Sequence, residues 1–323
     1  MPKVWLRVIV IAAPALVLLS AVGRSQAVKT IKVFSRLNSG SFLIVPVMVN
    51  RMGPYDFVLD TGSTSTMIDA SLFKTVGLHQ EGTTTLTSVT NRQTQATAMA
   101  SEVALNGISA TNVKVIAVNN FDSMVAAKLR VAGVSGREVA RVHGLLGENF
   151  LDHFDLLIDN VEHSVTLDAT EGLTRMYEGE QLPLSPTSNF QGTVVYHRPM
   201  VSATVMSFSR RPLHLLLDTA SSSLAILSGK STPGTSAQGG NAASVEIATP
   251  DGKVACAAWK GQLRWGRTSV NEVGVVSCNT AAAQALDNEG SMPTHIFRQI
   301  LISHANQYVV VNPVRRSSQP GDH

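Results

Sequence analysis

Two short segments of this chain place a carboxylate directly after an apolar run. Residues 60–63 read Asp-Thr-Gly-Ser, and residues 218–221 read Asp-Thr-Ala-Ser. A carboxylate that ends an apolar strand is costly unless it is solvated, and its simplest partner is a backbone amide of its own turn. If folding instead brings Asp60 and Asp218 together, the two carboxylates share a proton. Such a pair can deprotonate a water molecule and protonate the carbonyl that the water attacks.

The spacing of further blocks indicates that the two segments belong to an internal repeat. The two aspartates are 218 − 60 = 158 residues apart, and Asn106-Gly107 is echoed by Trp265-Gly266 at an offset of 266 − 107 = 159. A weaker echo relates residues 144–147, Gly-Leu-Leu-Gly, to residues 290–293, Gly-Ser-Met-Pro. Blocks that recur in one order at a nearly constant offset are typical of duplicated units. The sequence therefore predicts two homologous lobes, 28–180 and 190–315, followed by a polar tail at 316–323, with a pseudo-dyad between the two aspartates.

Short apolar runs between turn residues predict that both lobes consist mainly of strands. Asp251-Gly252 predicts a hairpin, and Asp69 and Gly77 predict the two ends of a short helix over Ala70–Val76. The predicted fold class is all-β with one or two short helices. The expected strands are 41–49, 55–59, 113–118, 156–158 and 165–167 in the first lobe, and 201–205, 213–217, 273–276 and 308–311 in the second.

The composition indicates an exported globular protein. Hydrophobic residues make up 44% of the 323 residues, which is enough to bury cores and excludes wholesale disorder. Residues 1–27 combine a basic start, an apolar stretch over 8–22 and small residues at 25 and 27, which predicts a signal peptide. We therefore expect a periplasmic or extracellular protein, with an uncleaved membrane anchor as the alternative. Outside this leader, 26 − 3 = 23 basic side chains balance 23 acidic ones, so no nucleic-acid partner is expected.

The remaining reactive side chains form no recognisable motif. The nine histidines include neither an HxH nor an HExxH pattern, so we expect no metal site and no cofactor. Cys256 and Cys278 are the two cysteines of the chain, and neither belongs to a CxxC motif. Export permits a disulfide between them, and two unpaired buried thiols are the alternative.

The first lobe resembles the retropepsin-like aspartic proteases, in particular exported bacterial members. The resemblance rests on Asp60-Thr61-Gly62-Ser63 and on Gly144-Leu145-Leu146-Gly147, which follows 144 − 60 = 84 residues later. It covers about residues 42–168, and a fainter resemblance covers about 200–312. It implies two acid-protease β-barrel lobes, a polypeptide substrate and no cofactor.

The resemblance also implies a role for each residue of the two aspartate segments. Asp60 and Asp218 would be the catalytic carboxylates, and Thr61 and Thr219 would form hydrogen bonds across the dyad. Further residues would support the loops or form a flap over the substrate. Gly62 would leave room for water and substrate, and Ser63 would bond the outer oxygen of Asp60. Ala220 and Ser221 would take these places in the second lobe. The flap tip would consist of Thr90, Asn91, Arg92 and Gln93.

Departures in the second lobe leave alternatives open. Ala220 stands where the resemblance implies glycine, and residues 290–293 replace the Gly-Leu-Leu-Gly segment. The main interpretation is a monomeric aspartic endopeptidase in which Asp60 and Asp218 activate water. One alternative is a peptide-binding protein on the same fold without catalysis. The other is a protease in which the first lobe pairs with the first lobe of a second copy.

Overall fold

The computed structural model describes residues 29–32, 42–87, 92–119, 121, 141–188, 194–195, 198–227, 242–249, 252–278 and 288–316. The predicted signal peptide, the expected flap residues Thr90 and Asn91, and Asp251 lie outside the described residues, as does the tail from residue 317 onward. Strands dominate the described ranges, so the predicted all-β class is confirmed. Within these ranges no helix has the length and apolarity needed to cross a membrane.

The first lobe is a seven-stranded sheet that closes on itself. The strand order is β2-β3-β8-β4-β7-β6-β5, and a further pairing between β2 and β6 closes the barrel. Alternate residues fill its interior, such as Val45, Val47, Phe57 and Leu59, which are fully buried. The strands are β2 (Ile44–Val49), β3 (Met52–Leu59), β4 (Thr66–Asp69), β5 (Gly82–Thr87), β6 (Arg92–Leu105), β7 (Ile108–Val118) and β8 (Gly144–Leu146).

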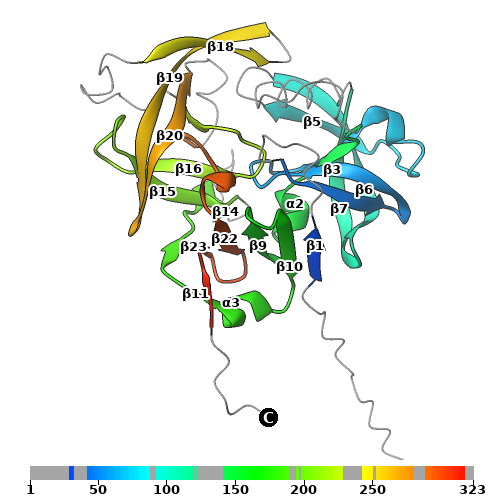
Figure 1. Ribbon diagram of the computed structural model, residues 1–323. Coiled ribbons are helices and arrows are strands. Elements are labelled where there is room, and N and C mark those ends of the chain that lie inside the picture. Colours follow the sequence, from blue (N-terminus) through cyan, green and yellow to red (C-terminus); the bar gives the residue numbers. More distant parts are fainter. Residues whose placement is uncertain are drawn as a thin grey trace, which may run out of the picture.

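The second lobe repeats this barrel strand for strand. Its order is β15-β16-β21-β17-β20-β19-β18, and a β15–β19 pairing closes it. Each strand therefore has a counterpart at the same place in the first barrel, and the two barrels lie side by side in Figure 1. The strands are β15 (Met200–Val205), β16 (Leu213–Asp218), β17 (Leu224–Leu227), β18 (Ala243–Thr249), β19 (Gly252–Trp265), β20 (Thr268–Cys278) and β21 (Gly290–Pro293).

One glycine in each lobe explains why residues 144–147 and 290–293 occupy equivalent positions although their sequences are only weakly similar. β3 pairs in parallel with β8 through Phe57 and Gly144, and β16 pairs in parallel with β21 through Leu215 and Gly290. A Cβ atom on Gly144 would lie 2.3 Å from the Phe57 ring, and one on Gly290 would lie 2.1 Å from the Ala225 carbonyl oxygen. Both barrels therefore require glycine at this crossing, while the residues that follow it are free to diverge.

A third sheet joins the lobes, and its strands come from both. The order is β1-β10-β9-β22-β23-β12, in which β9 and β22 form the antiparallel junction. It lies below and between the barrels (Figure 1). Several of these strands were predicted, but their common sheet was not. The strands are β1 (Lys29–Lys32), β9 (Asp155–Asp159), β10 (Ser164–Asp168), β12 (Gln181–Pro183), β22 (Gln299–Ser303) and β23 (Tyr308–Val311).

Short elements complete the described part of the chain. The predicted helix over Ala70–Val76 is too long: a 3₁₀ turn, η1, spans Ala70–Leu72, and turns continue to Gly77. Its first residue was placed correctly, because the Asp69 carboxylate caps it by accepting from the Ser71 amide. Its end was not, because Gly77, with a φ of 70°, closes the later turns and not the helix. The amide of Val76 bonds to the Leu72 carbonyl and that of Gly77 to the Lys74 carbonyl, so the chain continues as separate turns. The other elements are α2 (Glu148–Leu151), α3 (Gly172–Met176), η3 (Thr294–Ile296), and the strand pairs β11 (Tyr177–Glu178) with β24 (Val314–Arg315) and β13 (Thr187–Ser188) with β14 (Val194–Val195).

Cys256 and Cys278 form a disulfide between neighbouring strands of the second barrel. The two residues lie directly opposite in the antiparallel register of β19 and β20. Their Cα atoms are 4.5 Å apart, the spacing of a pair that exchanges no backbone hydrogen bond. The structure thus contains the bridge that the sequence left open.

We expect the double substitution Cys256→Ala, Cys278→Ala to lower the free energy of unfolding by about 3 kcal/mol. The reason is that the bridge closes a loop between cysteines 22 residues apart and so restricts the unfolded chain. Urea denaturation of both proteins measures the difference. Dithiothreitol should destabilise the wild type by a similar amount and leave the variant unchanged, and equal stability of all samples would contradict the prediction.

Candidate active site

The two aspartate segments meet between the lobes through reciprocal threonine bonds. The backbone amide of Thr61 donates to the Thr219 hydroxyl oxygen at 3.1 Å, and the amide of Thr219 donates to the Thr61 hydroxyl oxygen at 3.2 Å. Each hydroxyl in turn donates to a carbonyl of the other lobe, Thr61 to Leu217 at 2.9 Å and Thr219 to Leu59 at 2.7 Å. Both threonines are buried. Four bonds with twofold symmetry therefore fix the two loops against each other.

This contact brings the Asp218 carboxylate against the Asp60 loop. A Cβ atom built on Gly62 would lie 2.6 Å from Asp218 Cγ and 2.9 Å from each of its carboxylate oxygens. The carboxylate therefore occupies the space that a side chain at position 62 would need. Only glycine permits this approach, because it alone has no Cβ atom.

Each aspartate also accepts a hydrogen bond from its own turn. The Gly62 amide donates to Asp60 Oδ1 at 2.8 Å, and the Ala220 amide donates to Asp218 Oδ1 at 2.7 Å. Asp60 is 4% exposed, whereas Asp218 is partly exposed. Each carboxylate thus has the local-turn partner that its position predicts, and each amide orients the carboxylate that it holds.

The second lobe keeps the same loop although its sequence departs from that of the first. The Ser63 hydroxyl donates to the Ser65 carbonyl at 3.0 Å, and the Ser221 hydroxyl donates to the Ser223 carbonyl at 2.8 Å. The bond from Ser63 to Asp60 implied by the resemblance stays a prediction. Ala220 is absent from the described residues with positive φ, so its backbone conformation accommodates a methyl group.

The hairpin expected to supply the flap is formed by β5 and β6. Thr87 pairs with Arg92 and Leu86 with Gln93, so the chain reverses between residues 87 and 92. Gln93 is exposed and accepts a hydrogen bond from Gln95. The role of the tip as a cover for substrate stays a prediction.

Helix α2 buttresses the first aspartate loop, as the resemblance implies for the segment that begins at Gly144. The Glu148 amide donates to the Ser63 carbonyl at 2.8 Å. The Asn149 side chain accepts from both the amide and the hydroxyl of Thr66, at 2.7 and 2.8 Å. In the sequence, only their position indicates these contacts, because Glu148 and Asn149 are the two residues after the Gly-Leu-Leu-Gly segment.

A buried ion pair lies beneath this loop. Glu148 Oε2 is 2.9 Å from His304 Nε2, and the two side chains are 0% and 3% exposed. Burial by itself lowers the pKa of His304, but the charge and hydrogen bond of Glu148 outweigh it, and with the Phe154 carbonyl they raise that pKa to about 9. Burial raises the pKa of Glu148, against the opposing effect of His304. The two groups are therefore stable in the interior only as a pair.

We expect stability to decrease in alkaline solution because of this pair. Below about pH 6.5 His304 is protonated in both the folded and the unfolded chain, so the ion pair contributes its full stabilisation to the folded state. As the pH rises toward 9, the unfolded chain releases the proton first, and folding loses about 3 kcal/mol at most. Thermal denaturation across this range measures the loss. The variant Glu148→Gln, His304→Gln should lack it, His153→Gln on the exposed His153 should retain it, and equal slopes in all three proteins would contradict the assignment.

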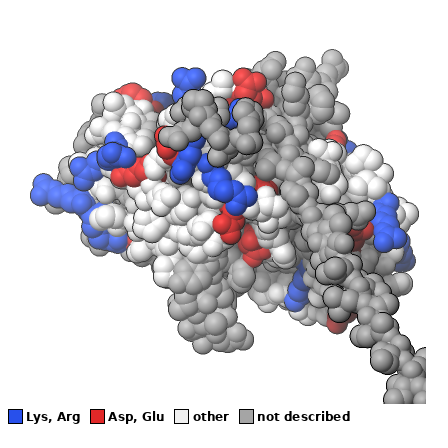
Figure 2. Space-filling model, turned by 90° about the horizontal axis from the view of Figure 1, so that it is seen from below, with Lys and Arg blue, Asp and Glu red and all other residues white. Residues whose placement is uncertain are grey.

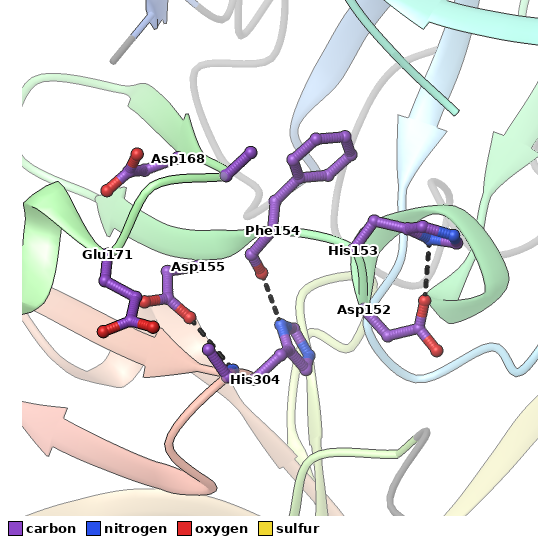
Figure 3. Close-up of a pocket in the computed structure, with 9 residues that line it drawn as sticks. Asp152, His153, Phe154, Asp155, Asp168, Glu171 and His304 are labelled. Carbon is purple, nitrogen blue, oxygen red and sulfur yellow. Dashed lines mark hydrogen bonds and ion pairs between the residues drawn. The ribbon is translucent and has the colours of Figure 1, made fainter. Parts of the chain in front are cut away.

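A pocket of about 140 Å³ lies beside His304 on the central sheet (Figure 3). Four of its nine lining residues are acidic, and the lining includes neither Asp60 nor Asp218, so the pocket is separate from the threonine-bonded loops. Among the described residues, no group of three or more His, Cys, Asp or Glu side chains has the arrangement of a metal site. The lining residues include Asp152, Asp155, Asp168, Glu171 and His304.

Residues 45–150 match a family model described as aspartyl protease. The match covers 150 − 45 + 1 = 106 of the 323 residues, all of them in the first lobe. The matched range contains both Asp60 and residues 144–147. The chain is also similar to the crystal structure of a retropepsin-like aspartic protease from Rickettsia conorii, with 19% sequence identity, coverage of 44% of this chain and 91% of that chain, and a TM-score of 0.30. Among curated proteins, none matches the chain in sequence.

The match to the aspartyl protease family model supports a protease-like function with peptide substrates. The family match ends at residue 150, before the second lobe begins. The second lobe shares with the first the strand order, the glycine at the strand crossing and the threonine-bonded loop.

Proposed function

We propose that the protein is an aspartic endopeptidase in which Asp60 and Asp218 activate one water molecule to hydrolyse peptide bonds. The observation that carries this proposal is the reciprocal bonding of Thr61 and Thr219, which holds the two aspartate loops in contact. A single chain contributes both carboxylates, which favours a monomeric enzyme over one completed by a second copy.

The chemistry follows from two carboxyl groups that share one proton. The ionised carboxylate removes a proton from the water, whose oxygen attacks the peptide carbonyl carbon, while the protonated carboxyl group donates to the carbonyl oxygen. The tetrahedral intermediate collapses when the carboxyl group that took the water proton protonates the leaving nitrogen. The other carboxylate takes a proton from one hydroxyl of the intermediate, and the C–N bond breaks. The amides of Gly62 and Ala220 keep one oxygen of each carboxylate in place during these transfers. Water supplies the proton that the amine gains, and the pair relays it and regains its single shared proton.

The proposed enzyme is exported. The signal peptide predicted over residues 1–27 and the Cys256–Cys278 disulfide both favour an oxidising compartment, either the periplasm or the extracellular space. N-terminal sequencing of the exported protein tests this, with Val28 expected as the first residue. Recovery of the uncleaved chain in the membrane fraction would instead support the anchor.

A polypeptide is the proposed partner, and charge gives no reason to expect nucleic acid. Basic and acidic side chains balance outside residues 1–27. On the face seen in Figure 2, Lys and Arg side chains lie among Asp and Glu side chains, with no continuous basic field.

The direct test is cleavage of a peptide library by the purified mature chain. We expect products between about pH 3 and pH 8, with a bell-shaped rate profile on the acid side, because a shared-proton pair titrates in two steps. Saturable peptide binding without products would support the non-catalytic alternative. A specific activity that falls on dilution would support the dimeric alternative, whereas an activity independent of concentration supports the monomer.

A further inference from the structure

We propose that the pocket beside His304 binds the α-ammonium group of Val28, which removal of the signal peptide would create at the start of the mature chain. The ligand is thus a primary ammonium ion that the chain itself supplies. The inference goes beyond the proposed endopeptidase and rests only on the proposed cleavage after Ala27, because an uncleaved chain has an uncharged amide at this position.

Two carboxylates that line the pocket lie directly opposite each other on neighbouring strands. Asp155 of β9 pairs with Asp168 of β10 in the antiparallel register, and both residues are 2% exposed. Asp168 accepts from the amide and hydroxyl of Thr170 and from the Leu173 amide, and none of these donors is charged. Like charges that face each other across a strand pair destabilise a sheet. The pocket therefore favours an occupant with positive charge.

One oxygen of Asp155 lacks a hydrogen-bond donor. Its Oδ1 atom accepts from the Ser303 hydroxyl at 3.0 Å and from the Ala305 amide at 3.2 Å, whereas its buried Oδ2 atom has no partner among the described residues. Burial raises the pKa of Asp155 and the charge of Asp168 adds to this effect, against the opposing effects of the two hydrogen bonds and of His304. A buried oxygen without a donor is costly, and an ammonium group offers three N–H donors.

The two histidines that line the pocket have carboxylate partners elsewhere. His304 Nε2 is 2.9 Å from Glu148 Oε2, and His153 Nδ1 is 3.0 Å from Asp152 Oδ1. Among the side chains that the structure describes, no lysine or arginine forms an ion pair with the other acidic lining residues. These residues lie on the other side of the pocket from His153 in Figure 3: Asp155, Asp168 and Glu171.

Strand β1 directs the start of the mature chain toward these carboxylates. Lys29 pairs with Leu167 in the antiparallel register of β1 and β10, so one further step along both strands brings Val28 opposite Asp168. Neighbouring strands are about 5 Å apart, so an ammonium group on Val28 would reach the Asp168 carboxylate. The proposed cleavage thus puts the new positive charge on the residue that the register aligns with the pocket. Because the pocket lies on the sheet that joins the lobes, the mature chain should be more stable than its precursor.

The experiment compares two chains with defined starts at neutral pH. One begins at Val28 with a free α-amine, and the other begins at Ser25, so that its ammonium group is three residues further from the sheet. Urea denaturation measures the equilibrium constant for unfolding of each chain. We expect this constant to be about tenfold larger for the longer chain, because its pocket holds no ammonium group. Equal constants would overturn the proposal.

Asp155→Asn and Asp168→Asn, made one at a time in both chains, test whether the effect is electrostatic. Each removes one negative charge from the pocket, so the difference between the two chains should fall to about threefold or less. Asp155→Asn retains an oxygen for the Ser303 and Ala305 donors, so its fold should be preserved even if Asp168→Asn disturbs the turn that follows β10.

Glu162→Gln is the matched control. It removes one negative charge from the exposed turn between β9 and β10, at the other end of the same strand pair. The full difference between the two chains should remain in this variant. A full difference in both pocket variants as well would overturn the proposal, because the effect of the longer chain would then be steric.

Methylammonium chloride, compared with sodium chloride at equal ionic strength, tests whether the pocket is filled from solution instead. It should stabilise the longer chain and leave the chain that begins at Val28 unchanged, because the pocket of the latter is occupied. Equal stabilisation of both chains would overturn the assignment to Val28, and so would a different first residue in the exported protein. None of these measurements needs turnover, so absence of peptide cleavage would refute the endopeptidase and leave this inference standing.

Discussion

Asp60→Asn and Asp218→Asn are each expected to lower the rate of peptide cleavage by about a thousandfold or more. An asparagine amide can neither accept the proton of the attacking water nor share a proton with the opposite carboxylate. It is close to isosteric with aspartate, so it retains the oxygen that accepts from the Gly62 or Ala220 amide. The folded structure and the threonine bonds should survive.

The measurement is kcat/KM on a peptide identified in the library, with melting temperatures recorded for each variant. Asp56→Asn is the matched control, because Asp56 lies on β3, four residues before Asp60 and outside the threonine-bonded loops. It should retain wild-type activity. Full activity of Asp218→Asn would refute the pairing of the two carboxylates within one chain.

Gly62→Ala is expected to lower kcat by about a hundredfold with a small change in KM. The new methyl group would lie 2.6 Å from Asp218 Cγ, whereas ordinary contacts begin at 3.4 Å, so the carboxylate must move by about 3.4 − 2.6 = 0.8 Å. A displacement of that size in a catalytic group removes the alignment on which proton transfer depends. Since the threonine bonds do not involve the position 62 side chain, most of the stability should remain.

Ala220→Gly is the control, because it makes the reverse change at the equivalent position of the other lobe. We expect it to keep activity within about threefold, since it removes a methyl group and adds no contact. Equal losses in the two variants would mean that loop rigidity, rather than the approach of Asp218 to Gly62, limits the reaction.

The two aspartate segments and the internal repeat could be predicted from the sequence, because each depends on residue types that recur at a fixed spacing. Asp60 and Asp218 were found because each is followed by threonine and a small residue, and because the spacing of the blocks indicated a repeat. The threonine bonds are in the predicted arrangement. The match between Gly144 and Gly290 was faint because packing constrains only the glycine, and the neighbouring residues differ between the lobes.

Features that depend on contacts between distant segments were missed. Glu148 and His304 are 304 − 148 = 156 residues apart, and an isolated histidine carries no sign that its partner is a glutamate in the other lobe. The shared central sheet was missed for the same reason, because strand patterns predict strands but not which edges meet. The short helix was overestimated because its two end signals are independent of whether the residues between them complete a second turn.

The junction of the central sheet has a consequence for how each half of the chain would behave alone. β9 and β22 occupy equivalent places in the two lobes and pair with each other in antiparallel fashion. A separated half would expose one of these apolar strands as the edge of a sheet, with unpaired amides and carbonyls along its length. Its most complementary neighbour would be the same strand of an identical molecule. A half-length fragment should therefore self-associate, whereas in the full chain β9 and β22 pair with each other and neither strand edge is open to a second molecule.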